Sequence, residues 1–179
     1  MAKAVNEFIN PPAAAAKTQT IEDILAAGEN ERVEFKASAR WDYREGKTNK
    51  ALEQVIVKTV ASFLNSKEGG ILVIGVEDNG NIVGLENDYR TLSQRPNRDG
   101  YQQFLVNLLS NSIGKVPCSS VSIEFSAPGN DEVCLVNCFA SPTPVYVQDG
   151  QQSKFYLRVG NTTQELSTKD SVAYIDRRW

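Results

Sequence analysis

Residues 69–78 read Gly-Gly-Ile-Leu-Val-Ile-Gly-Val-Glu-Asp, a glycine turn followed by an apolar run that ends on two acids. No charged side chain interrupts residues 71–76, which predicts a central strand buried on both faces. Residues 78–81, Asp-Asn-Gly-Asn, are a strong signal for a tight turn, so we expect a hairpin with a return strand over residues 82–85. The central strand then ends beside two carboxylates.

A second stretch, residues 28–36, reads Gly-Glu-Asn-Glu-Arg-Val-Glu-Phe-Lys and turns from a charged segment into a short strand. Side chains alternate between the faces of a strand, so Glu34 and Lys36 share one face and the phenylalanine between them points into the core. If this strand pairs with the apolar one, Glu29, Glu34 and Asp78 converge. Carboxylate oxygens are ligands for hard cations, and a neighbouring lysine neutralises developing phosphate charge, so this pattern favours metal-assisted phosphodiester cleavage.

The composition is that of one ordinary globular domain, with 179 residues of which 41% are hydrophobic. The net charge of −3 provides no global basic field, so any nucleic-acid binding must come from a local patch. The absence of histidine excludes histidine-containing zinc sites and histidine-dependent general bases. Three cysteines in or beside apolar segments indicate reduced thiols. No apolar run is long enough to cross a membrane, so we expect a cytoplasmic protein.

The pattern of elements predicts an α+β fold in which a mixed, largely antiparallel sheet is flanked by about four helices. Residues 1–19, which are rich in alanine and include two adjacent prolines, are expected to be a flexible segment or linker. Residues 20–179 are expected to form a single domain. The predicted helices begin at Thr20, cover about residues 49–65, extend from Tyr101 to Ile113, and follow the capping residues Ser167–Asp170.

Residues 46–48, Gly-Lys-Thr, match the end of a phosphate-binding P-loop, but Trp41 stands where that motif needs a glycine. ATP is therefore not expected as a ligand. The same loop carries Arg40, Arg44, Lys47 and Lys50, which suit contacts with phosphates. A solvated basic loop without a ligand explains these cations equally well.

Four motifs occur in an order that resembles a known family. They are Glu29-x4-Glu34-Phe35-Lys36, Phe63-Leu64-Asn65 with Gly69-Gly70, Ile74–Gly80 with Val83-Gly84-Leu85, and Phe155–Thr163. Together they resemble the Schlafen-type AlbA-like (Schlafen AlbA-2) domain, a nucleic-acid-binding and nuclease domain. The resemblance covers about residues 20–179 and identifies the chain as a prokaryotic, single-lobe member.

The resemblance implies a divalent-metal-dependent endoribonuclease acting on RNA such as transfer or ribosomal RNA. Its three metal-binding carboxylates fall on Glu29, Glu34 and Asp78, which would bind Mg²⁺ or Mn²⁺, and Lys36 would complete the catalytic set. Because the related nucleases join two lobes in one chain, a single-lobe protein is expected to form a homodimer. The alternative for these residues is a set of solvated charges, with Glu34 paired to Lys36 and Asp78 serving only in a turn.

The residues expected to contact RNA or DNA are cations and small polar side chains near the proposed groove. They are Lys36, Arg40, Lys47, Lys50, Arg158, Asn161 and Thr162. The last two equally well shape a tight connection before the final helix. Trp41 and Tyr43 either stack on unpaired bases or cover an edge of the core.

Two further classes of function remain open. In the first, the chain is a non-catalytic DNA- or RNA-binding module of a regulatory or defence protein. In the second, it is an interaction domain whose carboxylates are vestigial. Metal-dependent cleavage separates the nuclease from the binding module, and a steep salt dependence of binding separates both from the interaction domain.

Overall fold

The computed structural model describes residues 19–179, so the predicted linker, apart from residue 19, lies outside the described residues. The helices are α1 (Ile21–Ala27), α2 (Lys50–Asn65), α3 (Glu86–Arg90), α4 (Arg98–Ile113), the 3-10 helix η1 (Pro117–Ser120) and α5 (Thr168–Arg178). The strands are β1 (Val33–Lys36), β2 (Trp41–Asp42), β3 (Lys47–Thr48), β4 (Gly70–Ile74), β5 (Val121–Ser126), β6 (Val133–Cys138), β7 (Tyr146–Asp149), β8 (Gln152–Val159) and β9 (Thr162–Glu165). The predicted α+β class is confirmed.

The strands within residues 28–36 and 69–78 pair with each other in the central sheet. The order of this sheet is β1-β4-β6-β5, and β1 runs parallel to β4 from the pair Val33–Ile71 to the pair Lys36–Ile74. The contacts of β6 with β4 and β5 are antiparallel. The sheet is therefore mixed, and β1 is one of its two edge strands.

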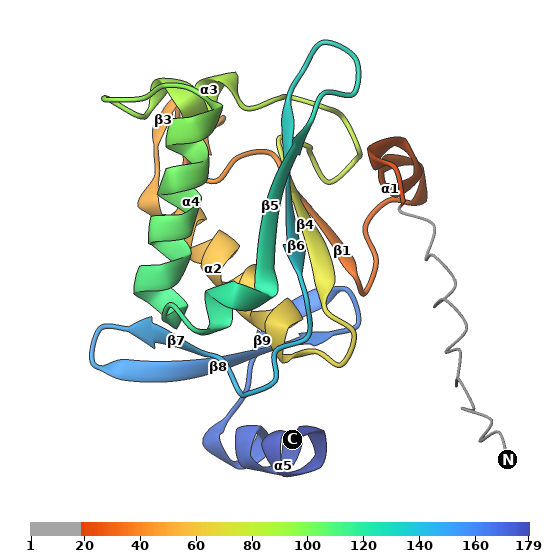
Figure 1. The fold of residues 1–179 in the computed structure, drawn as a ribbon, viewed down its shortest axis with the longest axis vertical. Helices are drawn as coiled ribbons and strands as arrows, with labels where there is room; N and C mark the ends of the chain where they lie inside the picture. The colour runs from red at the N-terminus through yellow and green to blue at the C-terminus, as the bar shows by residue number, and fades with distance from the viewer. Residues whose placement is uncertain (1–18) are drawn as a thin grey trace, which may run out of the picture.

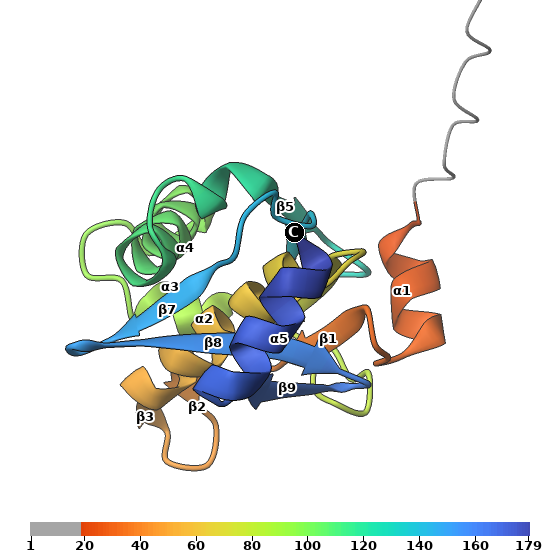
Figure 2. The same ribbon diagram turned by 90° about the horizontal axis from the view of Figure 1, so that it is seen from below.

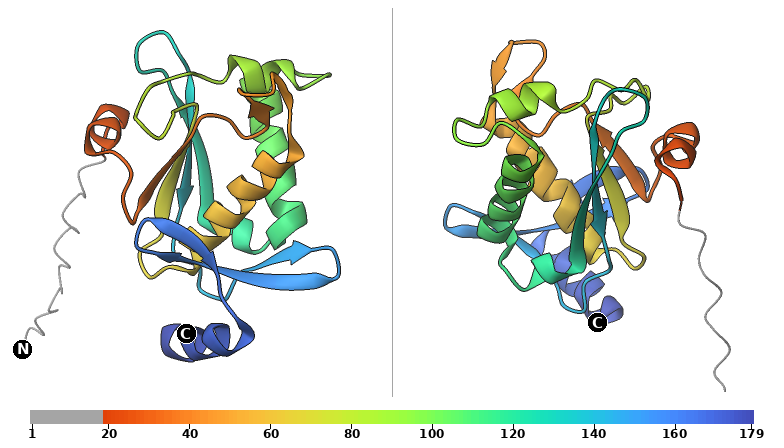
Figure 3. Two further views of the ribbon diagram at one scale, coloured as in Figure 1. Left: turned by 180° about the vertical axis from the view of Figure 1, so that it is seen from behind. Right: turned by 45° about the horizontal axis from the view of Figure 1, so that its top comes forward.

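Helices cover the central sheet on both faces, as Figure 1 and the two views of Figure 3 show. On one face, alternate β4 residues such as Leu72 and Ile74 pack with α2 and α4 in the larger core. On the other face, Phe35 and Val73 pack with Ile24 of α1 in a smaller core. The expectation that β4 is buried on both faces is thus confirmed.

A second sheet, β7-β8-β9, lies below the first in Figure 1 and packs against α2. In the view from below, α5 lies in front of this sheet (Figure 2). The side chain of Asn65, at the end of α2, joins the two parts. Its Nδ2 donates to the carbonyls of Val145 and Tyr156, both at 2.9 Å, and its Oδ1 accepts from the Val145 N–H at 2.8 Å. The strands predicted as one sheet are therefore divided between two, and a buried amide connects them.

Three local elements differ from the expectations. The return strand over residues 82–85 is only a single bridge between Val76 and Ile82, because the chain turns away after Gly84. The loop between residues 40 and 50 contains the two-stranded hairpin β2–β3. Helix α3 was not predicted, since five residues are too few to establish a helical period.

Gly69 makes the turn between α2 and β4 and is expected to tolerate no side chain. Its φ of 74° is one that L-residues rarely adopt, and an added Cβ would lie 2.1 Å from the backbone oxygen of Cys138. Gly69→Ala should lower the free energy of unfolding by about 2 kcal/mol, measured by urea denaturation. Gly150→Ala is the matched control, because its φ is also positive but a Cβ there meets nothing within 4 Å. Equal losses in the two variants would contradict this account.

The three cysteines are free thiols, with Cys134 and Cys138 buried and Cys118 half-buried. Burial raises the pKa of each thiol, which keeps all three protonated near neutral pH. Over residues 19–179, no helix combines the length and apolar character needed to span a membrane.

Candidate nucleic-acid interface

The free edge of β1 is closed by the segment that precedes it. Residues Asn30 and Val33 exchange backbone hydrogen bonds of 3.0 and 3.4 Å, which folds the charged segment back along the strand. Oε1 of Glu29 then accepts the backbone N–H of Phe35 at 2.8 Å. An edge strand otherwise presents unpaired N–H groups, so in this arrangement Glu29 serves the backbone.

Glu34 lies between two cations, on the face of β1 that is turned toward α2. Nζ of Lys36 is 2.7 Å from its Oε1, and Nη1 of Arg158 is 2.7 Å from its Oε2. The ion pair with Lys36, one of the alternatives left open by the sequence, is present. The side chain of Glu34 is 15% exposed and that of Arg158 only 3%, so this carboxylate is largely enclosed by positive charge.

Arg158 reaches this position from β8 in the second sheet. Its Nη2 donates to the backbone oxygen of Asn30 at 2.8 Å, and its guanidinium stacks over the ring of Phe63 with its Cζ 5.1 Å from the centroid. Nε has no hydrogen-bond partner among the described residues. In this arrangement the guanidinium contacts protein atoms, so the phosphate contact predicted for Arg158 has little exposed surface available.

The third predicted carboxylate, Asp78, lies on the turn after β4 and is 81% exposed. Its Oδ1 is 3.9 Å from Nζ of Lys36, so Lys36 links it to Glu34. Within the described part of the chain, no three acidic or cysteine side chains are grouped to hold a metal ion. Glu34 is already paired with two cations and Glu29 with a backbone N–H. As arranged, the predicted set does not fit Mg²⁺ or Mn²⁺ without repositioning of these side chains.

We call residues 40–50 the basic hairpin. It lies at the end of the molecule at which β1 and β4 finish (Figure 1). It carries four cations and two carboxylates, in a chain whose overall charge is negative. Lys47 pairs with Glu45 at 3.2 Å and is exposed. Arg44 and Lys50 are exposed and form no ion pair with any residue between 19 and 179. Two cations of the hairpin are thus available to an anionic ligand.

A buried carboxylate, Asp88 of α3, fixes the start of the basic hairpin. It accepts the backbone N–H groups of Ala39 at 2.8 Å and Trp41 at 3.1 Å, together with the hydroxyl of Ser38. Tyr101 of α4 donates its hydroxyl to Asp88 at 2.7 Å, and burial raises the pKa of this tyrosine so that it remains a donor. No sequence pattern indicates this role of Asp88, because an acid in a predicted loop is usually a turn residue.

Tyr43, at the tip of the hairpin, lies close to the loop that follows β4. Partial burial is the main cause of its raised pKa, while the side chain of Asn87 lowers it and the charges of Asp88 and Glu77 raise it further. Tyr43 is 43% exposed. The basic hairpin therefore lies at the same end of the central sheet as the loop that carries Asp78, the end at which β1 and β4 finish (Figure 1).

The remaining predicted contacts are spread over other surfaces. Arg40 is paired with Glu53 at 3.2 Å and only 17% of its side chain is exposed. Asn161 and Thr162 are exposed at the β8–β9 turn, where the Thr162 hydroxyl donates to the carbonyl of Val159 at 3.0 Å. This contact supports a role for Thr162 in shaping the turn.

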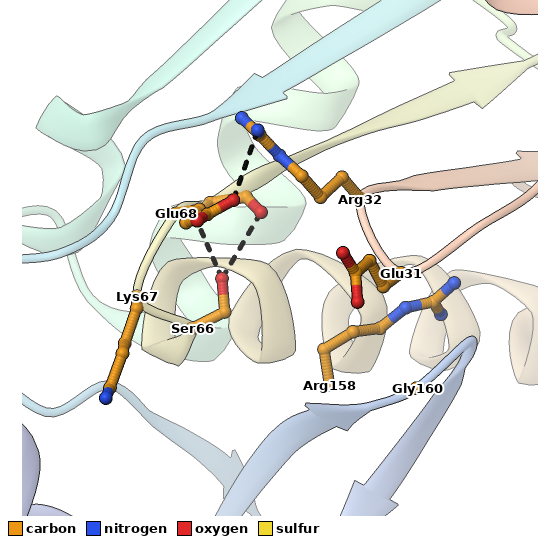
Figure 4. Close-up of a pocket in the computed structure, with 8 residues that line it drawn as sticks. Glu31, Arg32, Ser66, Lys67, Glu68, Arg158 and Gly160 are labelled. Carbon is orange, nitrogen blue, oxygen red and sulfur yellow. Dashed lines mark hydrogen bonds and ion pairs between the residues drawn. The ribbon is translucent and has the colours of Figure 1, made fainter.

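A small cavity of about 230 Å³ adjoins Arg158 at the amino end of β1 and β4 (Figure 4). Arg32 and Glu68 form an ion pair of 3.1 Å there, and Glu31 lies beside Arg158. Because positive and negative side chains alternate around it, this cavity has weaker preference for an anion than the basic hairpin has.

The central mixed sheet and the second antiparallel sheet, with helices around them, make up an α+β domain that carries a group of exposed cations. The model of the family Schlafen, AlbA_2 matches residues 29–167, and the chain belongs to this family. Membership indicates a function related to nucleic acids.

A solved structure, that of the DIP2311 protein from Corynebacterium diphtheriae, has a similar fold with a TM-score of 0.59 at 19% identity. The match covers 88% of this chain and 28% of that chain, so this domain spans about a quarter of its length. At this identity the likeness concerns the fold alone. No curated protein sequence is significantly similar to the chain.

Proposed function

We propose that this domain binds nucleic acid through its phosphate backbone, using the basic hairpin and Lys36. The observation that carries the proposal is the hairpin itself: Arg44 and Lys50 are exposed and without carboxylate partners among the described residues, and Asp88 holds the segment that precedes them. A cation that is held in place loses less conformational entropy when it binds, so fewer contacts are needed for a given affinity.

The charge of Glu34 supports binding in preference to metal-assisted cleavage. Two cations at 2.7 Å surround this carboxylate, so its negative charge is already neutralised by Lys36 and Arg158. A divalent cation has to displace these partners before it can bind Glu34, and Asp78, 3.9 Å from Lys36, is the only other acid that the described residues add to this group. The chain as a whole is acidic, so binding is expected to depend on this surface and to weaken steeply with salt.

Removing the two unpaired cations, as Arg44→Gln with Lys50→Gln, should weaken binding of transfer RNA about tenfold at moderate salt. The slope of log affinity against log salt concentration should become less steep by about one to two, because fewer counterions are released. Fluorescence anisotropy over a series of KCl concentrations measures both quantities.

The matched control is Lys115→Gln with Lys169→Gln, which changes the net charge equally at exposed positions outside the hairpin. This control should bind within twofold of the unmodified protein. If the two double variants lose affinity to the same extent, only the overall charge matters and the hairpin is not the binding surface.

Metal-dependent RNA cleavage is the second candidate function. It is favoured by the linked arrangement of Glu34, Lys36 and Asp78 at one end of the sheet, where the family resemblance predicts the nuclease carboxylates. Cleavage would require Glu34 to leave its ion pairs. Incubation with total transfer RNA in Mg²⁺, Mn²⁺ or EDTA, with Glu34→Gln as control, tests it. Metal-dependent fragments that disappear in the variant would establish the nuclease; intact RNA with a retained gel shift would support binding alone.

The homodimer implied by the single lobe is part of the same proposal. In a dimer, one nucleic-acid strand could contact two basic hairpins at once. The overall affinity would then rise although each copy makes the same contacts as a monomer. Sedimentation equilibrium with and without RNA measures it, and a monomer under both conditions would contradict it.

A further inference from the structure

A second, larger cleft lies beside the basic hairpin and is used by none of the roles described above. It occupies about 730 Å³ between the start of α2, the segment after α3 and one face of α4. This volume is in the range of sites for small organic ligands. The residues that line it include Arg40, Leu92, Arg95, Gln103, Phe104 and Asn107. We refer to it as the α4 cleft.

The floor of the α4 cleft is a flat platform made by an arginine stacked on an aromatic ring. Phe104 is half-buried, and the guanidinium of Arg40 lies over its ring with Cζ 4.6 Å from the centroid. Leu92 and Leu108 extend the apolar surface on either side. A planar guanidinium stacked on an aromatic ring is a surface on which a flat heteroaromatic group stacks well.

One wall of the α4 cleft consists of amide side chains. Gln103, Asn107 and Asn111 follow one another at four-residue intervals, which places them on one face of α4. Nε2 of Gln103 donates to Oδ1 of Asn107 at 3.0 Å. Each amide supplies donors and an acceptor without charge, and this combination matches the edges of nucleobases.

The charges of the α4 cleft favour an anion at one end. Arg40 and Glu53 neutralise each other at 3.2 Å. Arg95 is exposed and forms no ion pair within residues 19–179. The lining of the cleft therefore has one net positive charge, that of Arg95. A ligand with a flat heteroaromatic part and a negative group at some distance from it therefore complements the whole cleft.

The rim of the α4 cleft is closely packed. The carbonyl oxygen of Arg95 would lie 2.0 Å from a Cβ added to Gly100, so only glycine allows the segment before α4 to approach the helix this closely. The Asn97 N–H donates to the same carbonyl at 2.9 Å, and Oδ1 of Asn97 accepts from the Gly100 N–H at 3.0 Å. Arg95 is thus held beside the amide wall by a defined turn.

We propose that the α4 cleft binds one unpaired nucleotide, with its base stacked on the platform that Arg40 and Phe104 form and against the amide wall, and its phosphate at Arg95. The nucleotide is either one unit of a bound single strand, in which case the inference rests on the proposed function, or a free mononucleotide. Arg40 begins the basic hairpin and also covers Phe104, so a strand that follows the hairpin reaches the cleft directly. Occupation of the cleft would make the domain prefer unpaired strands to duplexes.

The test measures by fluorescence anisotropy how tightly the protein binds a single strand of ten adenosine nucleotides, and the same strand paired with its complement. Phe104→Leu, which keeps an apolar side chain, and Gln103→Ala, at an exposed position, should each weaken binding of the single strand about tenfold and change duplex binding less than twofold. Gln102→Ala is the matched control, because Gln102 is exposed on the same helix outside the cleft lining and should bind like the unmodified protein. Equal effects on single strand and duplex, or no effect on either, would overturn the proposal.

A second measurement separates failure of this proposal from failure of the proposed function. Adenosine monophosphate is titrated into the ¹⁵N-labelled protein while the side-chain amide signals of Gln103 and Asn107 are followed by NMR. If neither strand nor duplex binds but these signals shift, the cleft is a mononucleotide site and the proposed function fails. If no strand binds and the signals remain unchanged, both inferences are overturned.

Discussion

Asp88→Asn is expected to lower the free energy of unfolding by about 4 kcal/mol, because it removes one acceptor oxygen from a buried cluster of donors. Asp88 is 2% exposed, and its carboxylate accepts the backbone N–H groups of Ala39, Arg40 and Trp41 as well as the hydroxyls of Ser38 and Tyr101. The asparagine amide keeps one acceptor, and its NH₂ group faces at least two donors that lose their partner. Each buried donor left without an acceptor costs about 2 kcal/mol.

Urea denaturation measures this loss, and Glu86→Gln is the matched control. Glu86 lies on the same short helix, and its ion pair with Arg90 is exposed, so its removal should cost less than about 0.5 kcal/mol. Asp88→Asn should also weaken RNA binding in proportion to the loss of order in the basic hairpin. A variant as stable as the unmodified protein would show that Asp88 does not fix the segment from Ser38 to Trp41.

Arg158→Met should cost about 3 kcal/mol, since it leaves Glu34 largely buried with one cation in place of two. The variant also loses the hydrogen bond to the carbonyl of Asn30 and the contact with the ring of Phe63. These contacts join β8 to β1 and α2, so thermal unfolding should move to lower temperature without loss of cooperativity.

A double-mutant cycle separates the ion pair from the other contacts of Arg158. Adding Glu34→Gln to Arg158→Met removes the stranded carboxylate, so the double variant should recover about 1 kcal/mol relative to the sum of the single changes. Arg177→Met, on the exposed face of α5, is the control and should change stability by less than about 0.5 kcal/mol. Strict additivity would show that the two charges do not interact.

The elements that the sequence predicted well are those with a long or strongly apolar period. Helix α2 was expected at about residues 49–65 and lies at Lys50–Asn65, and α5 follows its predicted cap at Ser167. The apolar run of β4 predicted a strand buried on both faces. The division of the strands between two sheets was not predictable, because it depends on register and on contacts such as those of Asn65, which no local pattern contains.

The candidate site was predictable where it depends on alternation along one strand. Glu34 and Lys36 share a face as expected. Their ion pair was one of the two alternatives for Glu34, the other being a metal ligand. The second cation on Glu34, Arg158, comes from a strand far along the chain, so its contact could not be deduced from spacing. Asp88 was missed for the same reason: its partners at the start of the basic hairpin lie 47 to 50 residues away in the chain, and Tyr101 lies 13 residues away.

The amide of Asn65 also determines when the domain can be completed during synthesis. Its side-chain partners lie 80 and 91 residues further along, and its backbone oxygen accepts the hydroxyl of Tyr174, 109 residues away. Until those residues leave the ribosome, the end of α2 is uncovered, with the amide of Asn65 hydrogen-bonded only to water and the surrounding apolar surface exposed. The central sheet and its helices therefore wait for the second sheet, and this interval is when the nascent chain most needs protection by chaperones.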